Sequence, residues 1–280
     1  MRRKRTILLG IFMVLSFSFT AFAKNESNAV QPAFAPVSSP AALPKAKKEA
    51  GLDDYSVFRP LSETDDFEEI KALESEMLKR ANSLYTFGKL KKNMTASDID
   101  YNKAVKIYMD NADSVLNDSM KNKEKFRSFL DTAEPIWVLQ VSLGNQTVTY
   151  TFNIGRPVRD EIRGLLTSEQ LAKLEREAGH WKIVKVAWGD GKGDDYKDYI
   201  REGMAQENLR DESSVVVIGG TPGIGQPLAI MYEKETVKVI PASAAANDRL
   251  KSLMKQDGIQ TPADDPIEIC DLDDYIAALN

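Results

Sequence analysis

The sequence from Asp190 to Asp195 alternates carboxylates with glycines, a pattern that can surround a calcium ion. Asp190, Asp194 and Asp195 would supply oxygen ligands. However, Lys192 occupies a central position where a ligand is needed, and the full EF-hand pattern is missing. Carboxylates also interact favourably with the positive end of a helix that follows them. We therefore predict that Asp194 and Asp195 serve the next helix, that Asp190, Asp194 and Asp195 are only weak metal candidates, and that no metal is bound.

The chain contains a single histidine and a single cysteine. His180 precedes Trp181 at the start of an expected strand, where an imidazole could act as a general base. With no second histidine, sites that need several histidines are excluded, and no Gly-x-Ser-x-Gly sequence offers a serine nucleophile. Cys270 lies in an acidic stretch, which does not favour a thiolate. We predict that His180 is a strand-end residue, and we assign no catalytic residue.

An apolar run from Val215 to Ile218 leads into the sequence Gly219-Gly220-Thr221-Pro222-Gly223-Ile224-Gly225. This sequence resembles the first turn of short-chain dehydrogenases, in which glycines let backbone amides approach a pyrophosphate. Only 55 residues follow Gly225, too few for the remaining strand–helix units of such a domain. Tyr232 is followed at the relevant spacing by Thr236 rather than by lysine. We therefore predict a loop between two antiparallel strands, and no cofactor.

Residues 51–134 have the apolar spacing of helices. One amphipathic helix is predicted from the stripe that begins at Phe67 and ends at Leu84, with Asp65 and Asp66 favourable in its first turn. A second helix is expected from Asp98 to Leu116. A third, shorter helix would carry Phe126, Phe129 and Leu130 and end before Pro135.

Residues 135–258 change to the period of strands. Ile136–Leu143 and Gln146–Ile154 predict a hairpin with Gly144-Asn145 as its turn. A strand is expected from His180 to Trp188, with Val184, Val186 and Trp188 on one face and Lys182 joining them. The remaining expected elements are a helix between Thr167 and Gly179, a helix from Asp194 to Leu209, a strand from Ser213 to Ile218, a hairpin of Leu228–Tyr232 with Thr236–Ile240, and a helix ending at Gly258.

The expected fold class is therefore α+β, with an N-terminal helical segment followed by a mostly antiparallel or mixed sheet with packed helices. We expect residues 51–134 and 135–258 to share one domain. Residues 259–280 read as an acidic C-terminal tail with a short helix between Leu272 and Leu279.

The N-terminus has the three parts of a cleavable signal peptide. Residues 2–5 are all basic, an uncharged apolar run follows, and the run ends in Ala21-Phe22-Ala23. We predict cleavage after Ala23, with an uncleaved membrane anchor as the alternative. Residues 24–50, rich in proline, alanine and lysine, have too little apolar surface to fold and are predicted to be a disordered tether.

Removing residues 1–23 would change the formal net charge from −5 to −9, because that segment carries four basic residues and no acidic ones. Such a protein repels nucleic acid and anionic membranes, and no second long apolar run predicts stable membrane insertion. Its lack of disulfide pairs favours a bacterial source. We expect a secreted or cell-surface, non-catalytic protein whose α+β module binds an extracellular or envelope partner. The alternative is a secreted hydrolase with paired carboxylates, since Asp and Glu are abundant.

Overall fold

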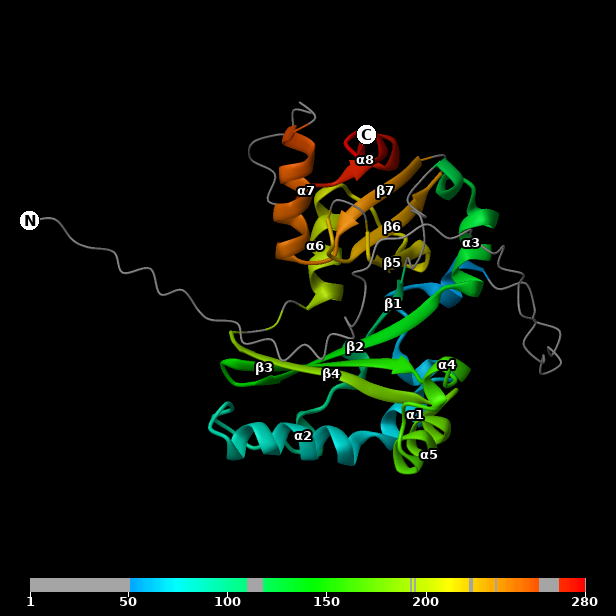
Figure 1. Cartoon of the computed structure of the whole chain (residues 1–280). Coiled ribbons are helices and arrows are strands. Elements are labelled where there is room, and N and C mark those ends of the chain that lie inside the picture. Colours follow the sequence, from blue (N-terminus) through cyan, green and yellow to red (C-terminus); the bar gives the residue numbers. More distant parts are fainter. Residues whose placement is uncertain are drawn as a thin grey trace, which may run out of the picture. The chain divides into compact units, whose positions relative to one another are not determined.

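A central sheet organises the chain from residue 51 onward. The computed structural model describes residues 51–109, 118–191, 193, 195–221, 224–234, 236–256 and 267–279. In these residues eight strands form one mixed sheet in the order β4-β3-β2-β1-β5-β6-β7-β8 (Figure 1). Neighbouring strands are antiparallel except β1 and β5, which are parallel. The predicted α+β class is confirmed.

The strands are β1 Val105–Met109, β2 Glu134–Leu143, β3 Gln146–Ile154, β4 Trp181–Asp190, β5 Val215–Gly219, β6 Leu228–Glu233, β7 Thr236–Pro241 and β8 Cys270–Asp271. The α-helices are α1 Phe67–Ala72, α2 Glu74–Thr86, α3 Lys123–Thr132, α4 Asp160–Arg163, α5 Ser168–Glu177, α6 Tyr196–Gln206, α7 Ala244–Gln256 and α8 Leu272–Ala277. Short 3-10 helices lie at Leu52–Tyr55, Leu61–Glu63, Ala96–Asp98, Tyr101–Lys103, Asp118–Lys121 and Glu212–Ser214.

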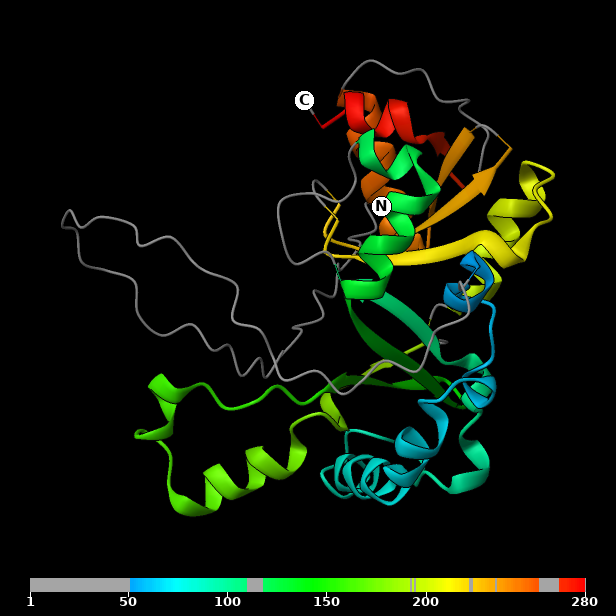
Figure 2. The same ribbon diagram turned by 90° about the vertical axis from the view of Figure 1, so that its right-hand side faces the viewer.

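The two faces of the sheet are covered differently. On one face, called here the five-helix face, β2–β4 pack against α1 and α2, while β5–β8 pack against α3, α7 and α8 (Figures 1 and 2). The opposite face, called here the α6 face, has its hydrophobic cluster under α6. That cluster involves β1, β5, β6, β7 and the inner residues of β2. The strands β1, β5, β6 and β7 are therefore buried on both faces.

The expected helix from Asp98 to Leu116 is wrong over its described residues. Val105–Met109 form strand β1, and residues 110–117 lie outside the described part of the chain. Val105 and Ile107 pack in the α6-face cluster, while Tyr108 packs on the five-helix face. A strand that is buried on both faces has no polar alternation, so its apolar residues can match a helical spacing by chance.

The other predicted elements are found with shifted ends. The stripe from Phe67 to Leu84 is divided into α1 and α2 at Leu73, and the turn at Gly144 has φ +66°. α5 begins with the expected capping box of Thr167 and Gln170. The predicted hairpin of Leu228–Tyr232 and Thr236–Ile240 is confirmed by the β6–β7 pairing.

A bulge corrects the predicted facing of β4. Thr151 pairs with Lys185 but Phe152 pairs with Ile183, so Val184 is an extra residue on β4. The extra residue reverses the alternation, so Trp181 and Ile183 lie on the same face as Val186 and Trp188. Val184 itself is 49% exposed.

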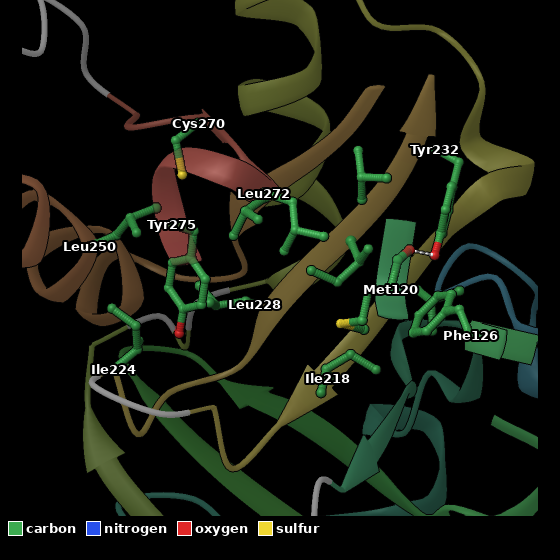
Figure 3. Close-up of a cluster of buried hydrophobic side chains, with 14 of the residues drawn as sticks. Met120, Phe126, Ile218, Ile224, Leu228, Tyr232, Leu250, Cys270, Leu272 and Tyr275 are labelled. Atoms are coloured by element: carbon green, nitrogen blue, oxygen red, sulfur yellow. Dashed lines mark hydrogen bonds between the residues drawn. The ribbon is translucent and has the colours of Figure 1, made fainter. Parts of the chain in front are cut away.

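The last described residues belong to the core. Cys270, Leu272 and Tyr275 are buried against β7 and α7, in the cluster that also holds Leu228 and Leu250 (Figure 3). The Tyr232 hydroxyl in the same cluster donates to the Met120 carbonyl. The short helix expected between Leu272 and Leu279 is present as α8, but it is a packed element of the sheet domain.

The described helices include none with both the length and the apolar character to cross a membrane.

Candidate interaction surface

The described carboxylates of the acidic sequence at the end of β4 have partners in neighbouring elements. Asp195 caps α6 by accepting from the backbone amides of Lys197 and Asp198, and its carboxylate lies 3.2 Å from Lys103 Nζ. Asp190 accepts from Gln146 Nε2 at 3.0 Å. Asp194 lies outside the described residues, as do Ala21 and Ala23 at the predicted cleavage site. Within the described residues no group of three potential metal ligands lies together. The structure thus places Asp195 in the helix-capping role.

His180 and Cys270 lie at opposite edges of the sheet, because β4 and β8 are its two outer strands. His180 precedes β4 and is exposed, with Nδ1 3.6 Å from Glu69 Oε1. Cys270 is buried, and burial, helped by nearby carboxylates, raises the pKa of its thiol. A buried thiol that resists ionisation is not a nucleophile, so the two residues form no catalytic pair.

The glycine-rich loop joins β5 to β6, which run antiparallel. Gly220 has φ +76° and Gly225 has φ +64°, conformations that favour glycine. The Thr221 hydroxyl donates to the Gln226 carbonyl, and the Gly225 amide donates to the Thr221 carbonyl. The chain therefore reverses direction here and does not cross over through a helix. This agrees with the predicted loop between two antiparallel strands.

A polar cluster around Asp66 was not predicted from the sequence. Its carboxylate accepts from Lys106 Nζ at 2.8 Å, from Trp137 Nε1 at 2.9 Å and from Trp181 Nε1 at 3.1 Å. Burial alone would raise the pKa of Asp66, but these hydrogen bonds and the lysine charge outweigh burial and lower it. The cluster joins β1, β2 and β4 to the start of α1, so we interpret it as structural. Asp66 lies at the N-cap of α1, in keeping with the favourable position expected for it, although its side chain makes no capping hydrogen bond.

Three hollows are lined by described residues, and each contains a single carboxylate. Asp195 lines the first, Glu134 the second and Asp190 the third. Asp195 caps α6, and Glu134 is paired with Arg156. The paired carboxylates that a glycoside hydrolase needs are therefore not found in these three hollows.

The α6 face is not covered evenly. Over β2, β3 and β4 its residues are mainly polar, and no hydrophobic cluster of the described residues forms there. We call this part the open panel; its residues are Gln140, Ser142, Thr147, Thr149, Thr151, Asn153, Lys182, Lys185, Ala187 and Gly189. Two of the hollows lie along it, on either side of Gly193.

A helical arm connects β3 to β4. Residues 156–179 contain α4 and α5, and neither helix has a buried residue. In Figure 2 the two helices extend sideways from the strand ends, apart from α1 and α2. Ile162 is 41% exposed and Leu165 is 82% exposed. With Ile154 at the end of β3, they account for half of the large apolar side chains that are exposed in the described residues.

The base of this arm is fixed to the sheet. The Gly179 amide donates to the Gly155 carbonyl, and the Gly155 amide donates to the His180 carbonyl. A Cβ at Gly155 would lie 1.9 Å from the Glu177 carbonyl oxygen, so the backbones meet too closely for any side chain there. Arg163 holds α4 to α5 through Glu175 at 2.6 Å.

A hollow of about 450 Å³ lies at the base of the arm. Pro135, Ile154, Pro157 and Ala178 give it a mostly apolar lining. Sequence reasoning missed both arm and hollow, because α5 has only Leu171 and Leu174 at core spacing and reads as an ordinary surface helix. The only indication in the sequence was Leu165-Leu166. These two apolar residues lie in a connection for which no core position was predicted.

The described surface thus combines a helical arm with exposed apolar side chains, a fixed base and a mainly polar panel. Comparisons with protein-family models, with curated proteins and with solved structures found no match to this chain.

Proposed function

We propose that the chain is an exported, non-catalytic binding protein, in which the sheet domain presents the arm of residues 156–179 to an apolar surface of another protein. The observation that carries this proposal is that α4 and α5 bury no residue although their base is fixed. Exposed apolar side chains that gather at one place are typical of contact surfaces. The secreted hydrolase remains the alternative, but the three hollows with one carboxylate each give it no support.

Export is supported by the basic start and by Ala21-Phe22-Ala23. N-terminal sequencing of the chain released by the producing cells should begin at Lys24. Recovery of the full-length chain in the membrane fraction would instead favour the anchor.

The arm can be tested by site-specific crosslinking. Because the chain's single cysteine, Cys270, is buried, a cysteine introduced on the surface is the preferred site for a thiol-directed photo-crosslinker. We expect Leu165→Cys, incubated with extracytoplasmic proteins of the producing cells, to give a discrete adduct. The matched control Ser252→Cys, on the exposed side of α7, should give none.

Competition makes the assay specific for the arm. Excess unlabelled wild-type chain should abolish the adduct, whereas the double variant Ile162→Asp, Leu165→Asp should not compete. Equal competition by that variant, or the same adduct from position 252, would show that the arm is not the binding element.

A further inference from the structure

The outer edge of β4 has an available row of backbone hydrogen-bonding groups. β4 is an outer strand of the sheet (Figure 1). The Gly191 amide donates to the Asn145 carbonyl at 2.6 Å, which sets the alternation of the β3–β4 ladder. Because of that alternation, the backbone N–H and C=O groups of Gly189 and Ala187 are hydrogen-bonded to β3. The N–H and C=O groups of Val186, Trp188 and Asp190 therefore point outward, and no described residue pairs with them.

The two halves of this edge differ in protection. Near its start β4 carries the bulge at Val184 and the lysines Lys182 and Lys185, devices by which edge strands discourage pairing. From Val186 to Asp190 the strand is regular and carries no lysine. Only this second half can accept another strand along a continuous ladder.

We infer that the edge from Val186 to Asp190 binds an extended segment of another protein as an added strand. Its backbone groups recognise only a polypeptide, because they require alternating donors and acceptors at strand spacing. A second copy of this chain fits less well, since five residues of pairing bury much less than the roughly 1,200–2,000 Å² of a stable interface.

The side chains beside this edge define the segment it fits. On the open panel Ala187 and Gly189 are small, and with Thr147 and Thr149 they line a hollow of about 210 Å³. On the five-helix face Val186 and Trp188 offer apolar contact. The Asp190 side chain pairs with Lys91 Nζ at 3.8 Å but is 80% exposed, so its carboxylate can also meet a basic residue at the end of the ladder. The segment should alternate polar and apolar residues, with a basic residue opposite Asp190.

The test uses a labelled peptide containing Lys-Thr-Val-Thr-Val. Laid antiparallel, its lysine faces Asp190, its valines face Trp188 and Val186, and its threonines lie beside the hollow. We expect fluorescence anisotropy to show binding to the full chain. N-methylation of the two valines removes amides that point to β4 and should weaken binding about tenfold or more, whereas N-methylation of the two threonines should have little effect.

Proline substitutions on the protein give the complementary test. Val186→Pro and Asp190→Pro each remove an outward N–H without breaking the ladder to β3, a position that edge strands tolerate. Each should keep the wild-type circular dichroism spectrum and weaken peptide binding about tenfold. Ala187→Pro removes an inward amide and should destabilise the fold. Leu165→Asp, on the arm, should leave peptide binding unchanged, so this site and the proposed function can fail separately.

Three results would overturn the inference. They are no binding of the peptide to the wild-type chain, equal binding to the folded Val186→Pro and Asp190→Pro variants, and a dimer of the chain that Val186→Pro dissociates. The last result would assign the edge to a second copy.

Discussion

The two halves of the sheet have opposite surroundings. β1, β5, β6 and β7 are covered on both faces, with α6 on one side and α3, α7 and α8 on the other. β2, β3 and β4 pack against α1 and α2 on one face, and on the other face only the inner residues of β2 join a hydrophobic cluster of the described residues. These strands carry the arm and the open edge. The covered half contains the glycine-rich loop, the sequence that resembles a nucleotide-binding turn. In the structure this loop connects two antiparallel strands. The half that contains β2, β3 and β4 carries the arm, the open panel and the outer edge.

Side chains on β1, β5, β6 and β7 pack against helices on one face or the other, so packing constrains them. On the open panel most side chains are at least partly exposed, although Thr147 is buried. We therefore expect substitutions in the two halves to differ in their effect on stability.

The largest difference is expected from core truncation. Ile218→Ala, at a fully buried position of β5, should lower the free energy of unfolding by about 3 kcal/mol, because it leaves a cavity between two helical layers. Val184→Ala, on the bulge of β4, should change it by less than about 0.5 kcal/mol. Urea unfolding of both variants measures the contrast. Equal losses would mean that the bulge is packed as tightly as the core.

The contribution of a buried lysine on α6 to stability should increase in the alkaline range. Burial lowers the pKa of Lys197 to about 8, although nearby Asp195 partly offsets this, and its Nζ donates to the Asn102 carbonyl at 2.7 Å. The folded chain loses this proton before the unfolded chain does, so the contribution of Lys197 to stability should rise with pH above 8. The full effect is on the order of 3 kcal/mol, at about 1.4 kcal/mol per pKa unit.

The measurement is urea unfolding between pH 7.5 and 9.5, read as the difference between variant and wild type, because Cys270 and the tyrosines are common to both chains and their ionisation cancels in that difference. Lys197→Met should be more stable than the wild type at pH 7.5, and the difference should shrink as pH rises. A Lys197→Met curve parallel to the wild type would contradict the shifted pKa. Lys173→Met, on α5, is the matched control and should show no such trend.

The Asp66 cluster should make the half-covered part sensitive to acid. Asp66→Ala leaves two indole N–H groups and Lys106 without their acceptor, which should cost about 2 kcal/mol. Because the pKa of Asp66 is lowered by folding, its contribution is present above about pH 4 and is lost as pH falls through the lowered value. The wild type and Asp66→Ala should therefore converge in stability in acid, as followed by urea titration at stepwise lower pH. A constant difference down to pH 2 would argue against this origin.

Helix caps offer a smaller but direct comparison. Asp195→Ala removes the cap of α6, which packs on the covered half, and should cost about 1 kcal/mol of global stability. Thr167→Ala removes the cap of α5, which buries nothing, so global unfolding should change little. Hydrogen exchange should show faster exchange confined to α5 in the second variant. A global loss from Thr167→Ala would show that the arm is part of the cooperative unit.

The smallest effect is expected from the arm itself. Leu165→Asp replaces a side chain that is 82% exposed and should leave the melting temperature nearly unchanged. Ile162→Asp should behave in the same way. A clear decrease would place these residues in a core and would weaken the proposal that they serve a partner.

Much of the fold followed from local pattern alone. Period-two alternation with Gly144-Asn145 predicted the β2–β3 hairpin, and the spacing around Phe126 predicted α3. The capping box at Thr167 predicted the start of α5, and the β-branched residues from Thr236 to Ile240 predicted β7 as the second strand of the β6–β7 hairpin. These elements were readable because turn chemistry and side-chain period act over a few neighbouring residues.

Other features depended on contacts between distant segments. Whether Val105–Met109 is a helix or a strand was decided by β2 and β5, which bury both of its faces. The bulge at Val184 follows from pairing with β3, and the Asp66 cluster brings together residues up to 115 positions apart. Local periodicity cannot specify which distant surfaces meet.

The sequence by itself determined the fold class, the expectation of export and the weakness of each catalytic motif. Only the tertiary structure showed the arm, the open panel and the outer edge of β4. The physical reason is that exposure is a property of the whole packing arrangement. Leu165 and Leu166 have the composition of core residues, yet Leu165 is 82% exposed and neither α4 nor α5 has a buried residue.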